Sequence, residues 1–78
     1  MDEKILVVDD EDNIRASLAG ILEDEGFRPM FANDGVTALD VMRKELPDLV
    51  LLDIWMPRMD GIEFLKRMKE LYPSVIII

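Results

Sequence analysis

LVLLDIWMPRMDG, residues 49–61, is the segment around which the predicted fold is organised. Its first four residues are apolar and run directly into one carboxylate, Asp53. The apolar run is too short for a helix and has no polar alternation, so it predicts a strand that is covered on both faces, as in a parallel sheet. Asp53 is then expected where this strand leaves the core.

A second run of the same kind lies near the start of the chain. Residues 5–8 are apolar and are followed at once by Asp9 and Asp10. Buried parallel strands bring their carboxyl ends to one edge of the sheet, which is where open α/β sheets bind their ligands. A lone acid at a strand end is usually only solvated, but two strands that both end in acids indicate a site.

Strands and helices are expected to alternate along the whole chain. The apolar runs predict strands at residues 4–8, 28–32, 49–52 and 75–78. Apolar residues at helical spacing mark three helices between them: Ile14, Leu18, Ile21 and Leu22; Leu39, Met42 and Leu46; Ile62, Leu65, Met68 and Tyr72. Pro29 cannot donate to a ladder, which makes its strand an edge. The pattern predicts an α/β, flavodoxin-like parallel sheet of order 2-1-3-4, with its switch point between the first and third strands.

Composition excludes several classes of function. The chain has 78 residues, with 9 basic and 17 acidic side chains and a net charge of -8, which argues against direct nucleic-acid binding by this segment. It has no cysteine, and so no disulfide framework and no thiolate metal site. Neither a signal peptide nor a membrane span is recognisable, so a cytoplasmic protein is expected.

The three acids at the strand ends favour a hard cation. Carboxylates in one crevice repel one another, and a bound cation relieves the repulsion. An oxygen-only site favours Mg²⁺ or Mn²⁺ over Zn²⁺. A carboxylate beside Mg²⁺ can also attack a phosphoryl group. Taken alone, residues 9–12 are better explained as a solvated, helix-capping charge run, and only their pairing with Asp53 across the switch point favours a site.

The sequence resembles the receiver domain of bacterial two-component response regulators over its whole length. The family pattern is an acidic pair after the first strand, here Asp9 and Asp10, and then D-x-x-M-P-x-M-D-G. All fixed positions of the second motif match: Asp53, Met56, Pro57, Met59, Asp60 and Gly61. The amino-acid sequence of the loop is most similar to that of the nitrogen-regulator (NtrC/NtrX-type) subgroup of transcriptional activators.

This resemblance implies a signalling module rather than an enzyme. Asp53 would accept a phosphoryl group from a sensor histidine kinase. Asp10, Asp53 and the backbone carbonyl of Trp55 would bind Mg²⁺ directly, and Asp9 would help through a bound water. The family's receivers continue past their fourth strand to a hydroxyl residue, a Lys and the output face. Residues 1–78 are therefore expected to be an incomplete receiver domain that ends in strand four and self-associates through that strand.

Two alternatives remain open at this point. One is a fragment of a haloacid-dehalogenase-like, Mg²⁺-dependent phosphatase, in which Asp10 would be the nucleophile of a D-x-D motif. Residues 10–14 supply the acids of that motif but end in Ile rather than Thr or Val. The other is an interaction module that is not phosphorylated. The identity of the phosphorylated Asp distinguishes the first alternative, and Mg²⁺ binding distinguishes the second.

Overall fold

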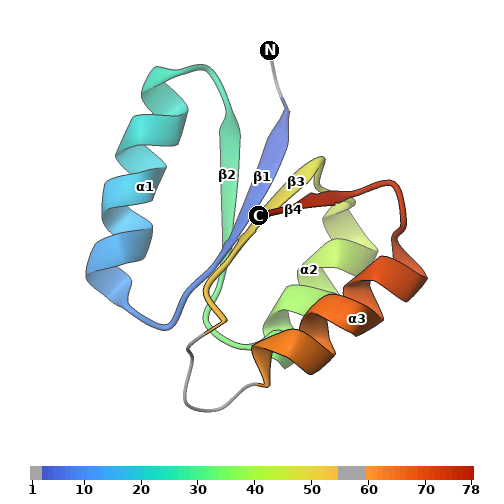
Figure 1. The fold of residues 1–78 in the computed structure, drawn as a ribbon. Coiled ribbons are helices and arrows are strands. Elements are labelled where there is room, and N and C mark those ends of the chain that lie inside the picture. Colours follow the sequence, from blue (N-terminus) through green and yellow to red (C-terminus); the bar gives the residue numbers. More distant parts are fainter. Residues whose placement is uncertain (1–2, 55–59) are drawn as a thin grey trace.

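The structure, a computed structural model, describes residues 3–54 and 60–78. Its elements are β1 (Lys4–Val8), α1 (Asp12–Asp24), β2 (Arg28–Ala32), α2 (Gly35–Glu45), β3 (Leu49–Leu52), α3 (Gly61–Leu71) and β4 (Ile76–Ile77). All strand pairs are parallel and the order is β2-β1-β3-β4, so the predicted topology is confirmed. α1 lies on one face of the sheet, and α2 and α3 lie on the other (Figure 1).

The core lies between the sheet and the pair α2 and α3. Side chains of a strand alternate between its two faces, and the fully buried Leu6, Val8 and Val50 point to this side. From the helices they meet Ala38, Met42, Phe64 and Met68. Ile5 and Val7 are also buried and, by the same alternation, face α1. Both faces of β1 are therefore covered, which explains the unbroken apolar run in its sequence.

The helix starts on the core side are capped by aspartates. Asp34 accepts a hydrogen bond from the backbone N–H of Thr37 (2.7 Å). Asp60 accepts from the N–H groups of Ile62 and Glu63, both at 3.1 Å. Each bond satisfies donors that have no partner inside the helix. These caps fix where α2 and α3 begin, at the end of the sheet from which Asp53 emerges.

The apolar stripe of the first helix is less buried than its spacing suggests. No residue of α1 is fully buried, and Ile21 is 59% exposed. Among the described residues α1 is the only helix on its face of the sheet, so its stripe meets the strands on one side and solvent on the other. The helix ends as its sequence indicates, because Gly26 takes the left-handed conformation (φ 89°) that L-residues disfavour.

The expected stripes of the second and third helices both need correction. Leu46 was expected on the second helix but is its C-cap, with φ 47° and 63% exposure, because Pro47 disfavours the right-handed helical conformation for the residue before it. On α3 the buried positions are Gly61, Phe64 and Met68. Ile62 was expected on the apolar stripe but lies one residue further round the helix than Gly61 and is 52% exposed. Tyr72, expected on the same stripe, is the C-cap that follows the helix.

Strand four is shorter than expected. β4 comprises Ile76–Ile77 rather than residues 75–78. The pairing with β3 nevertheless continues to Ile78, whose N–H donates to the carbonyl of Val50 (2.9 Å) and whose carbonyl accepts from Leu52 (2.9 Å). No helix in the two described ranges has the length and apolar character needed to cross a membrane.

Candidate functional site

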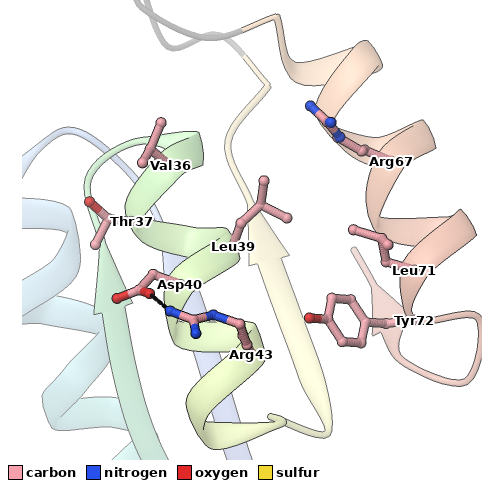
Figure 2. A pocket seen from close by; sticks show the side chains of 8 residues that line it. All are labelled: Val36, Thr37, Leu39, Asp40, Arg43, Arg67, Leu71 and Tyr72. Atoms are coloured by element: carbon pink, nitrogen blue, oxygen red, sulfur yellow. Dashed lines mark hydrogen bonds and ion pairs between the residues drawn. The ribbon is translucent and has the colours of Figure 1, made fainter.

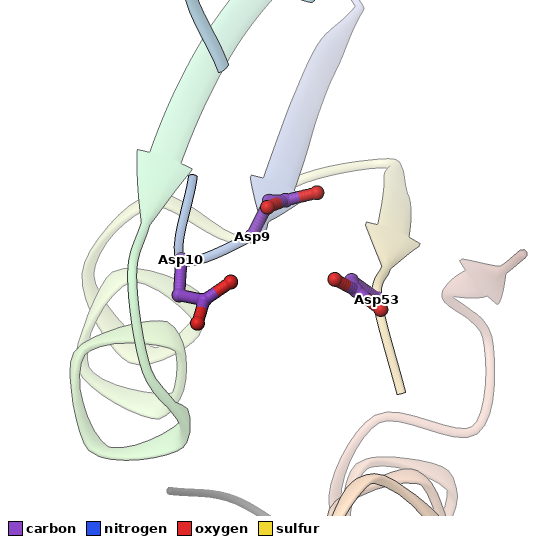
Figure 3. A group of neighbouring side chains, drawn as sticks. All are labelled: Asp9, Asp10 and Asp53. Atoms are coloured by element: carbon purple, nitrogen blue, oxygen red, sulfur yellow. The ribbon is translucent and has the colours of Figure 1, made fainter. Parts of the chain in front are cut away.

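Three carboxylates meet at the carboxyl edge of the sheet. Asp9 and Asp10 follow β1, Asp53 follows β3, and one oxygen of each lies within 4.8 Å of the others (Figure 3). Asp9 and Asp53 are half-buried, whereas Asp10 is exposed. Because β1 and β3 are adjacent parallel strands, paired as Val8↔Leu52, their next residues leave the sheet side by side. The structure thus brings together the three acids that the sequence singled out.

Backbone hydrogen bonds fix the positions of two of these acids. The N–H of Asp53 donates to the carbonyl of Val8 at 3.0 Å, which carries the β1–β3 ladder one residue beyond the strand. The N–H of Asp9 donates to Ala32 of β2 at 3.0 Å. Asp9 and Asp53 are therefore held by the sheet itself, and their separation follows from the spacing of neighbouring strands.

The turn from β1 into α1 is also held by side chains. One carboxylate oxygen of Asp9 accepts from the N–H of Glu11 (2.9 Å), and the Arg15 guanidinium donates to the backbone carbonyl of Asp9 (2.7 Å). Arg15 also pairs with Asp12. The sequence places Asp12 in a helix-capping charge run, but the N-cap is Glu11, which makes no side-chain cap bond. The i, i+3 spacing of Asp12 and Arg15 was the one sign in the sequence of this arrangement.

Gly61 has a role that its place in the motif does not reveal. A Cβ atom at this position would lie 2.6 Å from the Cα of Ile54, the residue directly after Asp53, and 2.8 Å from its carbonyl oxygen. Real Cβ atoms do not approach backbone this closely, so only glycine lets α3 begin against the end of β3. Gly61 therefore determines how near the third helix comes to the acid cluster.

A small hollow adjoins the acids on the α1 side of the sheet. It has a volume of about 190 Å³. Its lining combines apolar side chains of the strands and α1 with two of the three acids: Val7, Val8, Asp9, Leu18, Leu51, Leu52, Asp53 and Ile78. This space is open to solvent and large enough for a hydrated ion and a small anionic group.

A larger hollow lies elsewhere, between α2 and α3. Its volume is about 640 Å³, and it is lined by Val36, Thr37, Leu39, Asp40, Arg43, Arg67, Leu71 and Tyr72 (Figure 2). The acid in it, Asp40, is in ion pairs with Arg43 (2.5 Å) and Lys44 (3.1 Å). Hydrogen bonds from Arg43 first and Lys44 second hold the pKa of Asp40 below its ordinary value. An exposed helical ion-pair network of this kind is structural, and the volume of the hollow does not make it a reaction site.

The cluster at the sheet edge fits a hard divalent cation. Its donors are three carboxylates on converging backbone positions, with neither imidazole nor thiolate, and the chain contains no His and no Cys. Mg²⁺ is held in proteins by one or two carboxylates and keeps several waters, which suits a half-open site. The carbonyl of Trp55, expected to be a further ligand, lies outside the described residues.

Comparison with known proteins identifies the family of this chain. The sequence pattern of the family described as "Response regulator receiver domain" matches residues 5–78. Sporulation initiation phosphotransferase F of Bacillus subtilis is 50% identical over 78 residues, which is all of this chain and 63% of that protein.

Solved structures give the same result. NtrX from Brucella abortus superposes with a TM-score of 0.92 at 43% identity, over 99% of this chain and 18% of NtrX. The response regulator TrrA from Thermotoga maritima, solved in complex with Mg²⁺-BeF, superposes with a TM-score of 0.89 at 39% identity, over 96% of this chain and 65% of TrrA. TrrA has also been solved in complex with the histidine kinase ThkA. The chain thus spans less than two thirds of each of these relatives. By the match of its sequence and its fold alike, it belongs to the response regulator receiver domain family.

Proposed function

We propose that this chain is the phosphoacceptor module of a two-component system, in which Asp53 takes a phosphoryl group from a sensor histidine kinase. The observation that carries the proposal is the convergence of Asp9, Asp10 and Asp53 within 4.8 Å at the ends of two adjacent parallel strands. A kinase partner is supported by the complex of ThkA with the related TrrA. A transcriptional output is supported by the likeness to the alkaline phosphatase synthesis transcriptional regulatory protein PhoP of Bacillus subtilis, which is 44% identical over 70 residues.

In this proposal the nucleophile is Asp53, which stands at the phosphoacceptor position of the family's motif; its backbone is fixed and its side chain lines the hollow at the sheet edge. A carboxylate oxygen of Asp53 attacks the phosphorus of the phosphohistidine, the P–N bond breaks, and the electron pair returns to the imidazole. The product is an aspartyl phosphate. Asp53 reaches the hollow from half-buried surroundings, which restrict its rotamers and hold it near the position for attack.

The role of the other two acids follows from where they lie. Asp10 is exposed and can take a ligand from solvent, and we assign it and Asp53 as direct carboxylate ligands of Mg²⁺. Asp9 has one oxygen in the bond from Glu11, which suits a ligand that acts through water. The carbonyl of Trp55 completes the proposed set. When bound, Mg²⁺ would offset the negative charge of the incoming phosphoryl group.

The test uses a small phosphodonor. With acetyl phosphate and Mg²⁺, intact-mass measurement should show one added phosphate, and peptide mapping should assign it to Asp53. Asp53→Asn keeps the shape, removes the nucleophile and should remain unmodified. Asp40→Asn is the matched control, because it removes a carboxylate from α2 and leaves the sheet edge intact. Modification of Asp10 in place of Asp53 would support the phosphatase alternative, which the family match does not favour. Absence of any Mg²⁺ response would support an interaction module.

We further propose that the chain self-associates through β4. Ile76 and Ile78 are 61% and 73% exposed. The N–H and carbonyl of Ile78 are both bonded to β3. Because these groups alternate in direction from one residue of a strand to the next, the N–H and carbonyl of Ile77 point to the outer edge of the sheet. An apolar, β-branched edge without charge pairs readily with another chain. Sedimentation should therefore show oligomers at micromolar concentration, and Ile76→Lys, which adds a charge to the edge, should shift the chain to monomer. A wild-type chain that sediments as a folded monomer would refute this.

A further inference from the structure

Arg15 joins the acid site to the first helix. One terminal nitrogen of its guanidinium donates to the backbone carbonyl of Asp9 at 2.7 Å, and the other pairs with the carboxylate of Asp12. The Arg15 side chain is only 19% exposed, whereas the side chains of Arg43 and Lys44 on α2 are more than 60% exposed. A planar fork can hold two acceptors in fixed directions, which the single ammonium of lysine cannot do.

The segment that Arg15 holds is short and carries two of the three acids. Only residues 9–11 separate the end of β1 from the start of α1. Within them the N–H of Asp9 is bonded to β2, and its carboxylate is bonded to the N–H of Glu11. The carbonyl of Asp9 is the remaining polar group of that residue, and Arg15 is its partner. Asp10, the exposed member of the cluster, lies directly after this carbonyl.

We propose that Arg15 is a positioning residue for the metal pocket: by holding the carbonyl of Asp9 it sets the direction in which the side chain of Asp10 leaves the turn. The inference rests on the proposed function, because it concerns how well the same three acids hold Mg²⁺. Partners of this kind, which orient a ligand without touching the metal, commonly change metal affinity about 10- to 100-fold when they are removed.

The sign of the effect separates positioning from simple electrostatics. A guanidinium near three carboxylates repels an incoming cation, so its removal would tighten Mg²⁺ binding if charge alone mattered. Loss of the hydrogen bond to Asp9 would free the turn. Removal of the guanidinium would therefore weaken Mg²⁺ binding if its effect on the position of Asp10 is larger than the effect of its charge. We expect the second outcome, since the bond is short and sheltered while the charge is already paired with Asp12.

The experiment measures Mg²⁺ affinity by titration, without any phosphodonor, for the wild-type chain and for three variants. Arg15→Gln should weaken Mg²⁺ binding about tenfold. Arg15→Lys keeps the charge and one donor and should restore part of the affinity. Asp12→Asn breaks only the ion pair and should change the affinity little. Arg43→Gln is the matched control, because Arg43 forms an i, i+3 pair with Asp40 and bonds no carbonyl near the cluster.

The outcomes of the titration are distinct. Mg²⁺ binding by Arg15→Gln that equals or exceeds that of the wild type would overturn the inference, while leaving the proposed function intact. Failure of the wild-type chain to bind Mg²⁺ would instead overturn the proposed function. A melting scan without metal identifies a variant that is merely unfolded. If Arg15→Gln does not fold, the comparison of Arg15→Lys with wild type decides, and equal affinities for Mg²⁺ would contradict the positioning role.

Discussion

Removing one acid from the cluster should stabilise the metal-free fold. The three carboxylates lie within 4.8 Å of one another, so each like-charge pair costs at least about 0.9 kcal/mol at the dielectric constant of water and about 3.5 kcal/mol at an effective value of 20. Asp10 is exposed, so the lower figure is the appropriate one for its pairs. Asp10→Asn removes two of the three pairs and keeps the shape of the side chain. We expect a gain of about 1–2 kcal/mol in the free energy of unfolding at low salt.

Thermal unfolding monitored by circular dichroism measures this gain. For a domain of this size 1 kcal/mol corresponds to roughly 4–8 °C in melting temperature. The increase in melting temperature should become smaller as NaCl is added, because dissolved ions screen the repulsion between exposed carboxylates. At physiological ionic strength the screening length is about 8 Å, which is of the same order as the distances within the cluster. Glu70→Gln on α3 is the matched control, since it changes the net charge equally but lies outside the acid cluster.

Mg²⁺ should reverse the ranking of the two proteins. At one hundred times its dissociation constant a ligand stabilises the native state by about 2.7 kcal/mol, which exceeds the expected advantage of Asp10→Asn, and the wild-type chain should gain this amount. Asp10→Asn has lost a direct ligand and should gain little. The reasoning is refuted if Asp10→Asn and Glu70→Gln raise the metal-free melting temperature equally, or if Mg²⁺ stabilises Asp10→Asn as much as wild type.

Two further predictions concern α2. Arg43 and Lys44 lower the pKa of Asp40, so the ionised carboxylate stabilises the fold at any pH above its ordinary pKa of 3.8, and this stabilisation is lost as the pH falls through the pKa of the folded state. Asp40→Asn should therefore be less stable than wild type at pH 7. Urea titrations at a pH well below 3.8 should show the stabilities of the two proteins converging. Leu46→Gly should raise stability by about 0.5–1 kcal/mol, because a left-handed L-residue costs roughly 1–2 kcal/mol and the Leu46 side chain is mostly exposed. Leu46→Ala keeps the Cβ and should give no such gain, and equal urea midpoints for the two variants would contradict this.

The sheet and the acid cluster were predictable because they depend on local and topological rules. Apolar runs without alternation identify β1 and β3, and parallel pairing fixes which strand ends are neighbours. The residues whose placement was not predicted depend on tertiary contacts instead. Phe64 replaces Ile62 in the core because the rotation of α3 is set by how Gly61 packs on Ile54. The bond from Arg15 to Asp9 could not be predicted because its acceptor is a backbone carbonyl, and every residue type carries that group.

The dependence of the acid cluster on β1 and β3 also has a kinetic consequence. Asp9 and Asp53 are 44 positions apart in the chain (53 − 9), so they meet only after a long loop has closed. Contacts of such separation are slow to form, and the last of them to form are the first to be lost on unfolding. If the β1–β3 pair is absent from the transition state, Mg²⁺ should slow unfolding and leave the folding rate unchanged. If the pair is already present there, Mg²⁺ should accelerate folding instead. The effect of Mg²⁺ on the folding and unfolding arms of a chevron plot would thus show whether β1 and β3 pair before or after the transition state.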